Sequence, residues 1–239
     1  MSRPTELRFE ELDSAWSRVI ATLSASRQRD KAKSNDRADL DVTLLTGFLG
    51  SGKTTILRHI LEHPNGLKIA VVVNDVGGIE VDAHLVGEKT SGRISLANGC
   101  VCCALADDLS HQLETLARIG DCDVVIIEAS GVADPISIAH TIHETNGCHL
   151  DGIVAVADPI SLEEQFGNQH TALLLRRQLQ AAHLVLVSKA DLVNEHARQS
   201  ASDLIAEAAP GSRILSLENG QIDVTVLCGA ADRGVSLTN

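Results

Sequence analysis

One run of nine residues constrains this chain more than any other feature. Residues 47–55 read Gly-Phe-Leu-Gly-Ser-Gly-Lys-Thr-Thr, which matches the phosphate-binding pattern G-x-x-x-x-G-K-[ST]. An apolar stretch at residues 42–45 precedes this run, and a helix-like stretch at residues 56–61 follows it. This order of strand, glycine-rich loop and helix is the context that the motif requires, because loop amides and the helix N-terminus then face the same phosphate oxygens. The run therefore predicts an α/β fold of the P-loop class.

The P-loop motif assigns a role to each of its polar and flexible positions. Its glycines let backbone amides turn towards phosphate oxygens. We expect Lys53 to reach the β- and γ-phosphates, and the hydroxyl of Thr54 to bind Mg²⁺. The nucleotide-contacting positions expected from the motif are Gly47, Gly50, Ser51, Gly52, Lys53, Thr54 and Thr55.

Strand-like and helix-like segments alternate from residue 41 onwards. The expected strands are residues 42–46, 69–74, 93–96, 123–128, 151–157, 183–188 and 213–217. The expected helices are residues 53–63, 104–118, 135–144, 170–180 and 194–208. Such alternation predicts a mainly parallel sheet that is flanked by helices on both faces. Because aromatic residues make up 2% of the chain, we expect a core of Val, Ile, Leu and Ala.

The sequence divides into three parts. Residues 1–40 contain an amphipathic helix with the single Trp16, followed by a charged linker; residues 41–220 form the P-loop domain, and residues 221–239 form a short tail. No apolar stretch approaches the roughly 18 residues of a membrane span, and the N-terminus does not resemble a signal sequence. With 20 Lys and Arg against 32 Asp and Glu, the net charge of −12 gives no nucleic-acid footprint. We expect a cytoplasmic protein with reduced thiols, acting on neither nucleic acid nor membranes.

Three thiols lie within four residues, at Cys100, Cys102 and Cys103. Thiolates are soft ligands that suit Zn²⁺ or Cu(I), and neighbouring cysteines rarely form unstrained disulfides. We interpret the group as a metal site; the alternative is three small buried apolar side chains. The other cysteines are scattered along the chain and are expected to serve packing. They are Cys122, Cys148 and Cys228.

Two further segments carry carboxylates at the ends of expected strands. Residues 124–127 are apolar and end at Glu128, and Gly131 follows in a sharp turn. In P-loop enzymes this position holds the acidic residue near Mg²⁺ and the attacking water, so we expect Glu128 there and the Gly131 amide on the γ-phosphate. Asp75 follows another expected strand and is a candidate Mg²⁺ or switch residue. Glu80 and Asp82 have two equally good interpretations: they supply oxygen ligands to a metal, or they are solvent-exposed residues of a loop.

A final segment bears on the choice of base. Residues 188–191 read Ser-Lys-Ala-Asp after an apolar strand, which resembles the guanine-reading N-K-x-D motif. Asp191 is expected to accept hydrogen bonds from guanine N1–H and the exocyclic amine, a donor pair that adenine lacks. The stem of Lys189 is expected to lie along the base. We expect the replacement of Asn by Ser188 to remove a supporting hydrogen bond.

The histidines form no tract. His140 and His143 share a helical face near Cys148 and His149, which allows a metal site, but scattered surface histidines are the favoured interpretation.

Together these motifs resemble the CobW-type metallochaperone GTPases, relatives of the UreG and HypB nickel-insertion GTPases. The resemblance covers roughly residues 41–220. It rests on residues 47–55, 74–77, 98–103, 128–135 and 188–191. It implies slow GTP hydrolysis coupled to binding a transition metal, most often zinc or cobalt, and delivering it to a client protein. It also implies dimerisation on GTP.

The expected function is thus a GTPase switch that controls a thiolate metal site, with Lys53 and Glu128 as catalytic residues. The sequence supplies no obvious arginine finger, so turnover is expected to be slow. Two alternatives remain at this point. One is a regulatory GTP-binding module without hydrolysis, and the other is a P-loop phosphotransferase with structural cysteines.

Overall fold

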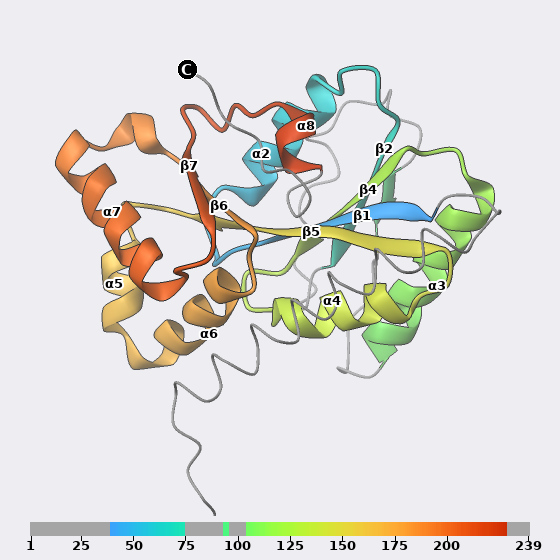
Figure 1. The fold of residues 1–239 in the computed structure, drawn as a ribbon, viewed down its shortest axis with the longest axis horizontal. Coiled ribbons are helices and arrows are strands. Elements are labelled where there is room, and N and C mark those ends of the chain that lie inside the picture. Colours follow the sequence, from blue (N-terminus) through green and yellow to red (C-terminus); the bar gives the residue numbers. More distant parts are fainter. Residues whose placement is uncertain (1–38, 75–92, 96–103, 229–239) are drawn as a thin grey trace, which may run out of the picture. The chain divides into compact units, whose positions relative to one another are not determined.

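The computed structural model describes residues 39–74, 93–95 and 104–228, in which strands and helices alternate (Figure 1). The strands are β1 Leu40–Thr46, β2 Ile69–Asn74, β3 Arg93–Ser95, β4 Val124–Ala129, β5 Cys148–Ala157, β6 Leu184–Val187 and β7 Arg213–Ser216. The helices are α2 Lys53–Glu62, α3 Ala104–Ile119, α4 Pro135–Glu144, α5 Leu162–Gly167, α6 Gln169–Gln180, α7 Glu195–Ala208 and α8 Val224–Leu227, with the 3₁₀ helix η2 at Ala190–Leu192.

The seven strands form one sheet in the order β3-β2-β4-β1-β5-β6-β7, and every pairing between them is parallel. Strand β1 lies in the middle, between β4 and β5, with Leu45 opposite Glu128 on one side and Val154 on the other. Because all strands run the same way, the loops after β1, β4, β5 and β6 meet at one edge of the sheet. The P-loop therefore lies at the same edge of the sheet as the segments that follow β4, β5 and β6.

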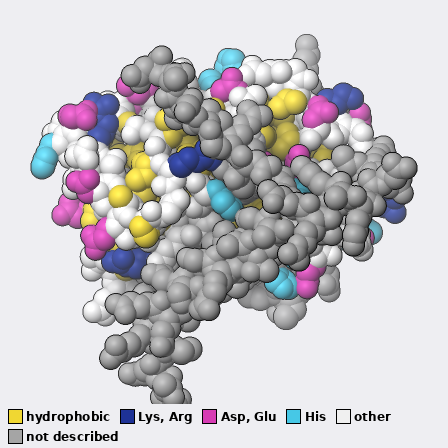
Figure 2. Space-filling model, in the orientation of Figure 1, with side chains coloured by type: hydrophobic (Ala, Val, Ile, Leu, Met, Phe, Trp, Pro, Cys, Tyr) yellow, Lys and Arg dark blue, Asp and Glu magenta, His cyan; other side chains and the backbone are white. Residues whose placement is uncertain are grey.

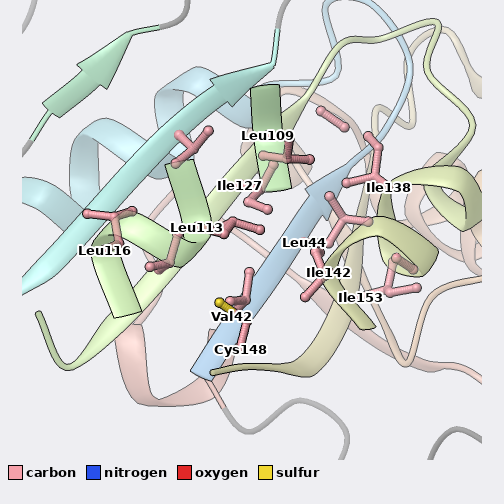
Figure 3. Close-up of a cluster of buried hydrophobic side chains, with 14 of the residues drawn as sticks. Val42, Leu44, Leu109, Leu113, Leu116, Ile127, Ile138, Ile142, Cys148 and Ile153 are labelled. Atoms are coloured by element: carbon pink, nitrogen blue, oxygen red, sulfur yellow. The ribbon is translucent and has the colours of Figure 1, made fainter. Parts of the chain in front are cut away.

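Helices cover both faces of the sheet, since its strands are apolar on both sides (Figure 1). On one face, α3 and α4 pack against β1, β2 and β4, and Figure 3 shows Leu109, Leu113 and Ile142 meeting Leu44 there. Helices α5, α6 and α7 cover the other end of the same face, over β5 and β6. Helices α2 and α8 cover the opposite face. The predicted α/β P-loop fold with helices on both faces of a parallel sheet is confirmed.

Side-chain caps fix where several helices begin. Asp134 accepts a hydrogen bond from the amide of Ile136 at the start of α4, and Pro135 occupies the first helical position. Asn168 and Asn194 cap α6 and α7 in the same way.

The predicted elements agree with the structure to within one to three residues at their ends, but three short helices, α5, η2 and α8, were not predicted. The last of them lies within the predicted tail at residues 221–239, of which the structure describes residues 221–228. Ile222, Val224 and Leu227 are buried in the same core cluster as Leu45, so this stretch packs on the domain. The capping Asp223 accepts from the amide and hydroxyl of Thr225 and starts α8 there.

The predicted N-terminal helix within residues 1–40 lies outside the described residues. Among the described helices, none is both long and apolar enough to cross a bilayer. On the face drawn in Figure 2, acidic and basic side chains of the described residues are interspersed.

Candidate functional site

The P-loop joins β1 to α2 in a backbone conformation that requires glycine. Gly47, Gly50 and Gly52 have φ values of 136°, 71° and 100°, a range that favours residues without a Cβ. At Gly47 there is also no room, because a Cβ there would lie 2.3 Å from the carbonyl oxygen of Val156 in β5. The loop is thus pressed against the neighbouring strand, which fixes its path.

The loop presents unpaired amides where the motif expects phosphate. Within the described part of the chain, the amides of Gly50, Gly52 and Thr54 donate no hydrogen bond, whereas Ser51 N donates to Phe48 O at 3.2 Å. These amides stand at the N-terminus of α2, the positive end of the helix dipole. An anion bound there would meet both features.

Lys53 lies over the loop rather than in solvent. Its side chain is buried, and Nζ donates to the carbonyl oxygens of Gly47 at 2.7 Å and Phe48 at 3.2 Å. The ammonium group is therefore held beside the amides that the motif assigns to phosphate.

The next side chain of α2 reaches across to β4. Thr54 Oγ1 donates to Glu128 Oε1 at 2.9 Å, although 74 residues separate them in the chain. Adjacent β1 and β4 make this contact possible by bringing the end of β4 beside the P-loop. A hydroxyl and a carboxylate are hard oxygen ligands of the kind that Mg²⁺ prefers, so the pair fits this ion.

The turn after β4 touches the P-loop. A Cβ on Gly131 would lie 2.6 Å from the amide nitrogen of Leu49, so only glycine fits there. The Gly131 amide donates no hydrogen bond within the described residues. This agrees with an amide that is available to a phosphate oxygen.

The loop after β6 is hydrogen-bonded to the P-loop. Ser188 Oγ donates to Ser51 O at 2.6 Å and contacts Ala157 O at 3.2 Å. Ser188 therefore makes its own hydrogen bond to the P-loop at the position where the motif has Asn. Asp191 Oδ1 accepts from the amide of Asn219 at 3.0 Å and keeps lone pairs for further donors.

Lys189 links three loops. Its Nζ lies 2.6 Å from Asp158 Oδ2 and 2.9 Å from Gly50 O, and its backbone φ of 51° is unusual for a residue with a side chain. Asp158, which follows β5, is buried and was not singled out from the sequence. An Asp directly after a buried strand was the available signal. Gln178 of α6, which contacts the turn after β4, had no signal in the sequence.

The predicted metal ligands Asp75, Cys100, Cys102 and Cys103 lie outside the described residues. Within the described part of the chain, no three His, Cys, Asp or Glu side chains gather as a metal site. His140 pairs with Glu144 at 3.2 Å, and His149 pairs with Asp41 at 3.1 Å.

Of the scattered cysteines, Cys148 is buried in the core beneath α3 and α4. Burial, with nearby acidic groups and Cys122, raises the pKa of its thiol to about 11. The thiol is therefore neutral at pH 7, which agrees with the expected packing role.

Comparison with known proteins decides the family. The family model described as CobW/HypB/UreG, nucleotide-binding domain, matches residues 41–216. The chain belongs to the CobW/HypB/UreG family. Its fold is also found in HypB from Helicobacter pylori in complex with nickel, with a TM-score of 0.56 at 18% identity over 84% of this chain and 87% of that one.

Within the CobW/HypB/UreG family, curated relatives include zinc proteins. The chain is 37% identical over 196 residues to the zinc chaperone YjiA of Escherichia coli, covering 78% of this chain and 60% of that protein. It is 32% identical over 225 residues to the zinc chaperone CobW of Pseudomonas aeruginosa, covering 80% and 60%. A crystal structure of Zn(II)-bound YjiA GTPase from E. coli aligns with a TM-score of 0.61 at 32% identity, over 81% of this chain and 62% of that one.

The zinc-regulated GTPase metalloprotein activator 1 of Dictyostelium discoideum is 30% identical over 257 residues, covering 92% of this chain and 53% of that protein. The chain thus spans a little over half of the length of these relatives.

Proposed function

We propose that this chain is a GTP-hydrolysing switch that binds zinc and passes it to a client protein. The observation that carries the proposal is the 2.9 Å contact between Thr54 Oγ1 and Glu128 Oε1 at the start of the P-loop helix. The contact supports the proposal because a hydroxyl and a carboxylate are hard oxygen ligands of the kind that a magnesium-bound nucleotide needs. The names of the relatives, zinc chaperones and a zinc-regulated GTPase activator, support GTP and zinc as the ligands.

Phosphate binding falls to the P-loop itself. The unpaired amides of Gly50, Gly52 and Thr54 would accept phosphate oxygens, and Lys53 would exchange its loop carbonyls for the β- and γ-phosphates. Charge that develops on the γ-phosphate during hydrolysis would then face an ammonium group and fixed dipoles.

Mg²⁺ would be held by Thr54, with Glu128 beside it and Asp75 as the proposed further ligand. When bound, the ion neutralises phosphate charge. Because Glu128 already contacts Thr54, the same carboxylate is placed to orient the attacking water. Glu128 thus serves both binding and hydrolysis in this proposal.

Asp191 would read the base and make the protein selective for GTP. The Asn219 amide and the backbone of η2 hold its carboxylate in place. The ammonium group of the neighbouring Lys189 is fixed by Asp158 and Gly50 O. The aliphatic part of this side chain would therefore pack along the face of the base in one fixed position.

Zinc, or cobalt in its place, would bind the thiolates of Cys100, Cys102 and Cys103. These residues lie in sequence between segments that contact the nucleotide, so the γ-phosphate would alter their geometry. Zinc and GTP affinity would then be linked reciprocally. We further propose cytoplasmic action, a client metalloprotein and GTP-dependent dimerisation.

The decisive test is a competitive zinc titration under reducing conditions, with Mg-GDP and with a slowly hydrolysed Mg-GTP analogue. We expect tight binding that shifts between the two nucleotides, and a Cys102→Ser variant that loses it. Equal, weak zinc binding in both states would overturn the metal switch. Cys122→Ser serves as the matched control, because Cys122 lies outside the motif.

Hydrolysis is tested separately with Glu128→Ala. We expect turnover to fall by about 10²-fold or more, and Mg-GDP affinity, which also depends on Lys53 and the loop amides, to fall by a smaller factor. The matched control is Glu144→Ala, which removes a surface carboxylate paired with His140. Unchanged turnover in Glu128→Ala, or no turnover in the unmodified protein, would overturn the catalytic part of the proposal.

A further inference from the structure

Helix α6 reaches the turn after β4 through one buried side chain. Gln178 is 0% exposed, and its Nε2 donates to Gly131 O at 3.1 Å and to Ala133 O at 3.3 Å. Both amide hydrogens are therefore used on a turn that lies 45 or more residues earlier in the chain. A second contact joins the same elements at the surface, where Arg177 lies 3.6 Å from Asp134.

The other half of the Gln178 amide is unsatisfied. Oε1 is buried and has no hydrogen-bond partner within the described residues. A buried acceptor without a partner is costly, so the position gains from Gln178 only through its donors. The side chain of Gln178 therefore acts through the two N–H donors of its amide, not through its oxygen.

The two carbonyls held by Gln178 determine how the turn presents its amides. The carbonyl and the N–H of one peptide plane point in opposite directions. Holding Gly131 O towards α6 therefore directs the N–H of Val132 away from it. The amides of Gly131 and Val132 donate no hydrogen bond within the described part of the chain. Both stay available beside Leu49 of the P-loop, which Gly131 contacts.

We infer that Gln178 is a positioning residue for γ-phosphate recognition: by holding Gly131 O, it turns the amide of Val132 towards the phosphate, next to the amide of Gly131. This inference rests on the proposed function, in which GTP occupies the P-loop. Gln178 touches no nucleotide itself and acts through the turn. Because GDP lacks the γ-phosphate, the effect is confined to the triphosphate.

The test compares Mg-GDP with a slowly hydrolysed Mg-GTP analogue on the full 239-residue protein. In Gln178→Leu, which has no donor, we expect the dissociation constant of the analogue to rise by about fivefold to tenfold and that of GDP to change less than about twofold. With GTP as substrate, kcat should fall as well. Gln165→Leu is the matched control, since Gln165 is half-buried and donates to Ser161 rather than to the turn after β4.

A second variant grades the effect and guards against misfolding of the first. In Gln178→Glu, burial and two facing carbonyls favour the protonated acid, which donates one hydrogen bond instead of two. We expect an intermediate loss of analogue affinity. A variant that merely loosened packing would weaken GDP and the analogue alike.

The outcomes separate the two claims. If the unmodified protein binds both nucleotides but both variants keep the unmodified ratio of affinities, Gln178 has no positioning role and the proposed function stands. If the unmodified protein binds neither nucleotide, the proposed function and this inference fall together.

Discussion

The hydroxyl of Ser188 donates a 2.6 Å hydrogen bond to the carbonyl oxygen of Ser51, across 137 residues of sequence. Lys189 strengthens the same junction through Gly50 O and Asp158. The segment that we propose to read the base therefore also supports the loop that we propose to bind phosphate.

Ser188→Ala should weaken all guanine nucleotides together. It removes a buried donor and leaves the carbonyl of Ser51 with one partner fewer, a loss of about 1–3 kcal/mol. We expect dissociation constants for GDP and GTP to rise by about tenfold, with the preference over ATP unchanged because Asp191 is intact. Competition binding with the three nucleotides measures this.

The control for that variant is Ser212→Ala. Ser212 Oγ donates to Ala182 O at 2.6 Å, but outside the site. It should lower thermal stability without changing nucleotide affinity. An equal loss of nucleotide affinity in both variants would mean that the effect of Ser188 is general destabilisation.

Asp191→Asn should change the preferred base. The amide of Asn donates where the carboxylate accepted, so it opposes the guanine amine and matches the carbonyl oxygen of xanthine. We expect GTP affinity to fall by about 10²-fold and xanthosine triphosphate to bind better than GTP. Retained GTP preference in this variant would show that another residue reads the base.

Gly47→Ala should damage the fold as well as the site. Its φ of 136° disfavours alanine, and the new Cβ would lie 2.3 Å from Val156 O in the central sheet. We expect a loss of about 2–4 kcal/mol in the free energy of unfolding, measured by urea denaturation. Gly211→Ala is the control, because a Cβ there meets nothing within 4 Å.

His183 should make stability fall in mild acid. Burial, and then the charge of Arg213, lowers the pKa of His183 below its ordinary value, and the Ile153 amide donates to Nδ1 at 3.1 Å. Below about pH 6.5 the unfolded chain therefore binds a proton that the folded chain does not, so stability decreases as pH falls.

The measurement for His183 is the urea midpoint at pH 7.5 and pH 5.5, compared between the unmodified protein and His183→Gln. The variant should show a smaller decrease with acid. His196→Gln, on the exposed face of α7, should leave the decrease as it is. An equal decrease in all three proteins would assign the pH effect to other groups.

Much of the fold was readable from the sequence because its signals are local. The P-loop glycines and the apolar strands, such as residues 124–127, mark the elements directly, and parallel order follows from their alternation. The three helices that were missed, α5, η2 and α8, have six, three and four residues, too few for a periodic pattern. Their burial depends on partners that lie far away in the chain.

For the candidate site, the sequence predicted the roles that a single local motif assigns, but not the contacts between separate segments. Thr54 and Glu128 were each expected near the nucleotide, but their direct contact depends on the pairing of β1 with β4. Asp158 and Gln178 contribute through contacts with loops from other strands, which spacing along the chain does not encode. The same holds for Ser188, whose hydroxyl donates to Ser51 O at the position where the guanine-reading motif has asparagine.

The contact between Gly131 and Leu49 sets how closely the turn after β4 approaches the P-loop. A Cβ at residue 131 would lie only 2.6 Å from the Leu49 nitrogen, so any side chain there would push the turn away from the loop. The spacing between these two segments therefore depends on a single hydrogen atom standing in place of a side chain.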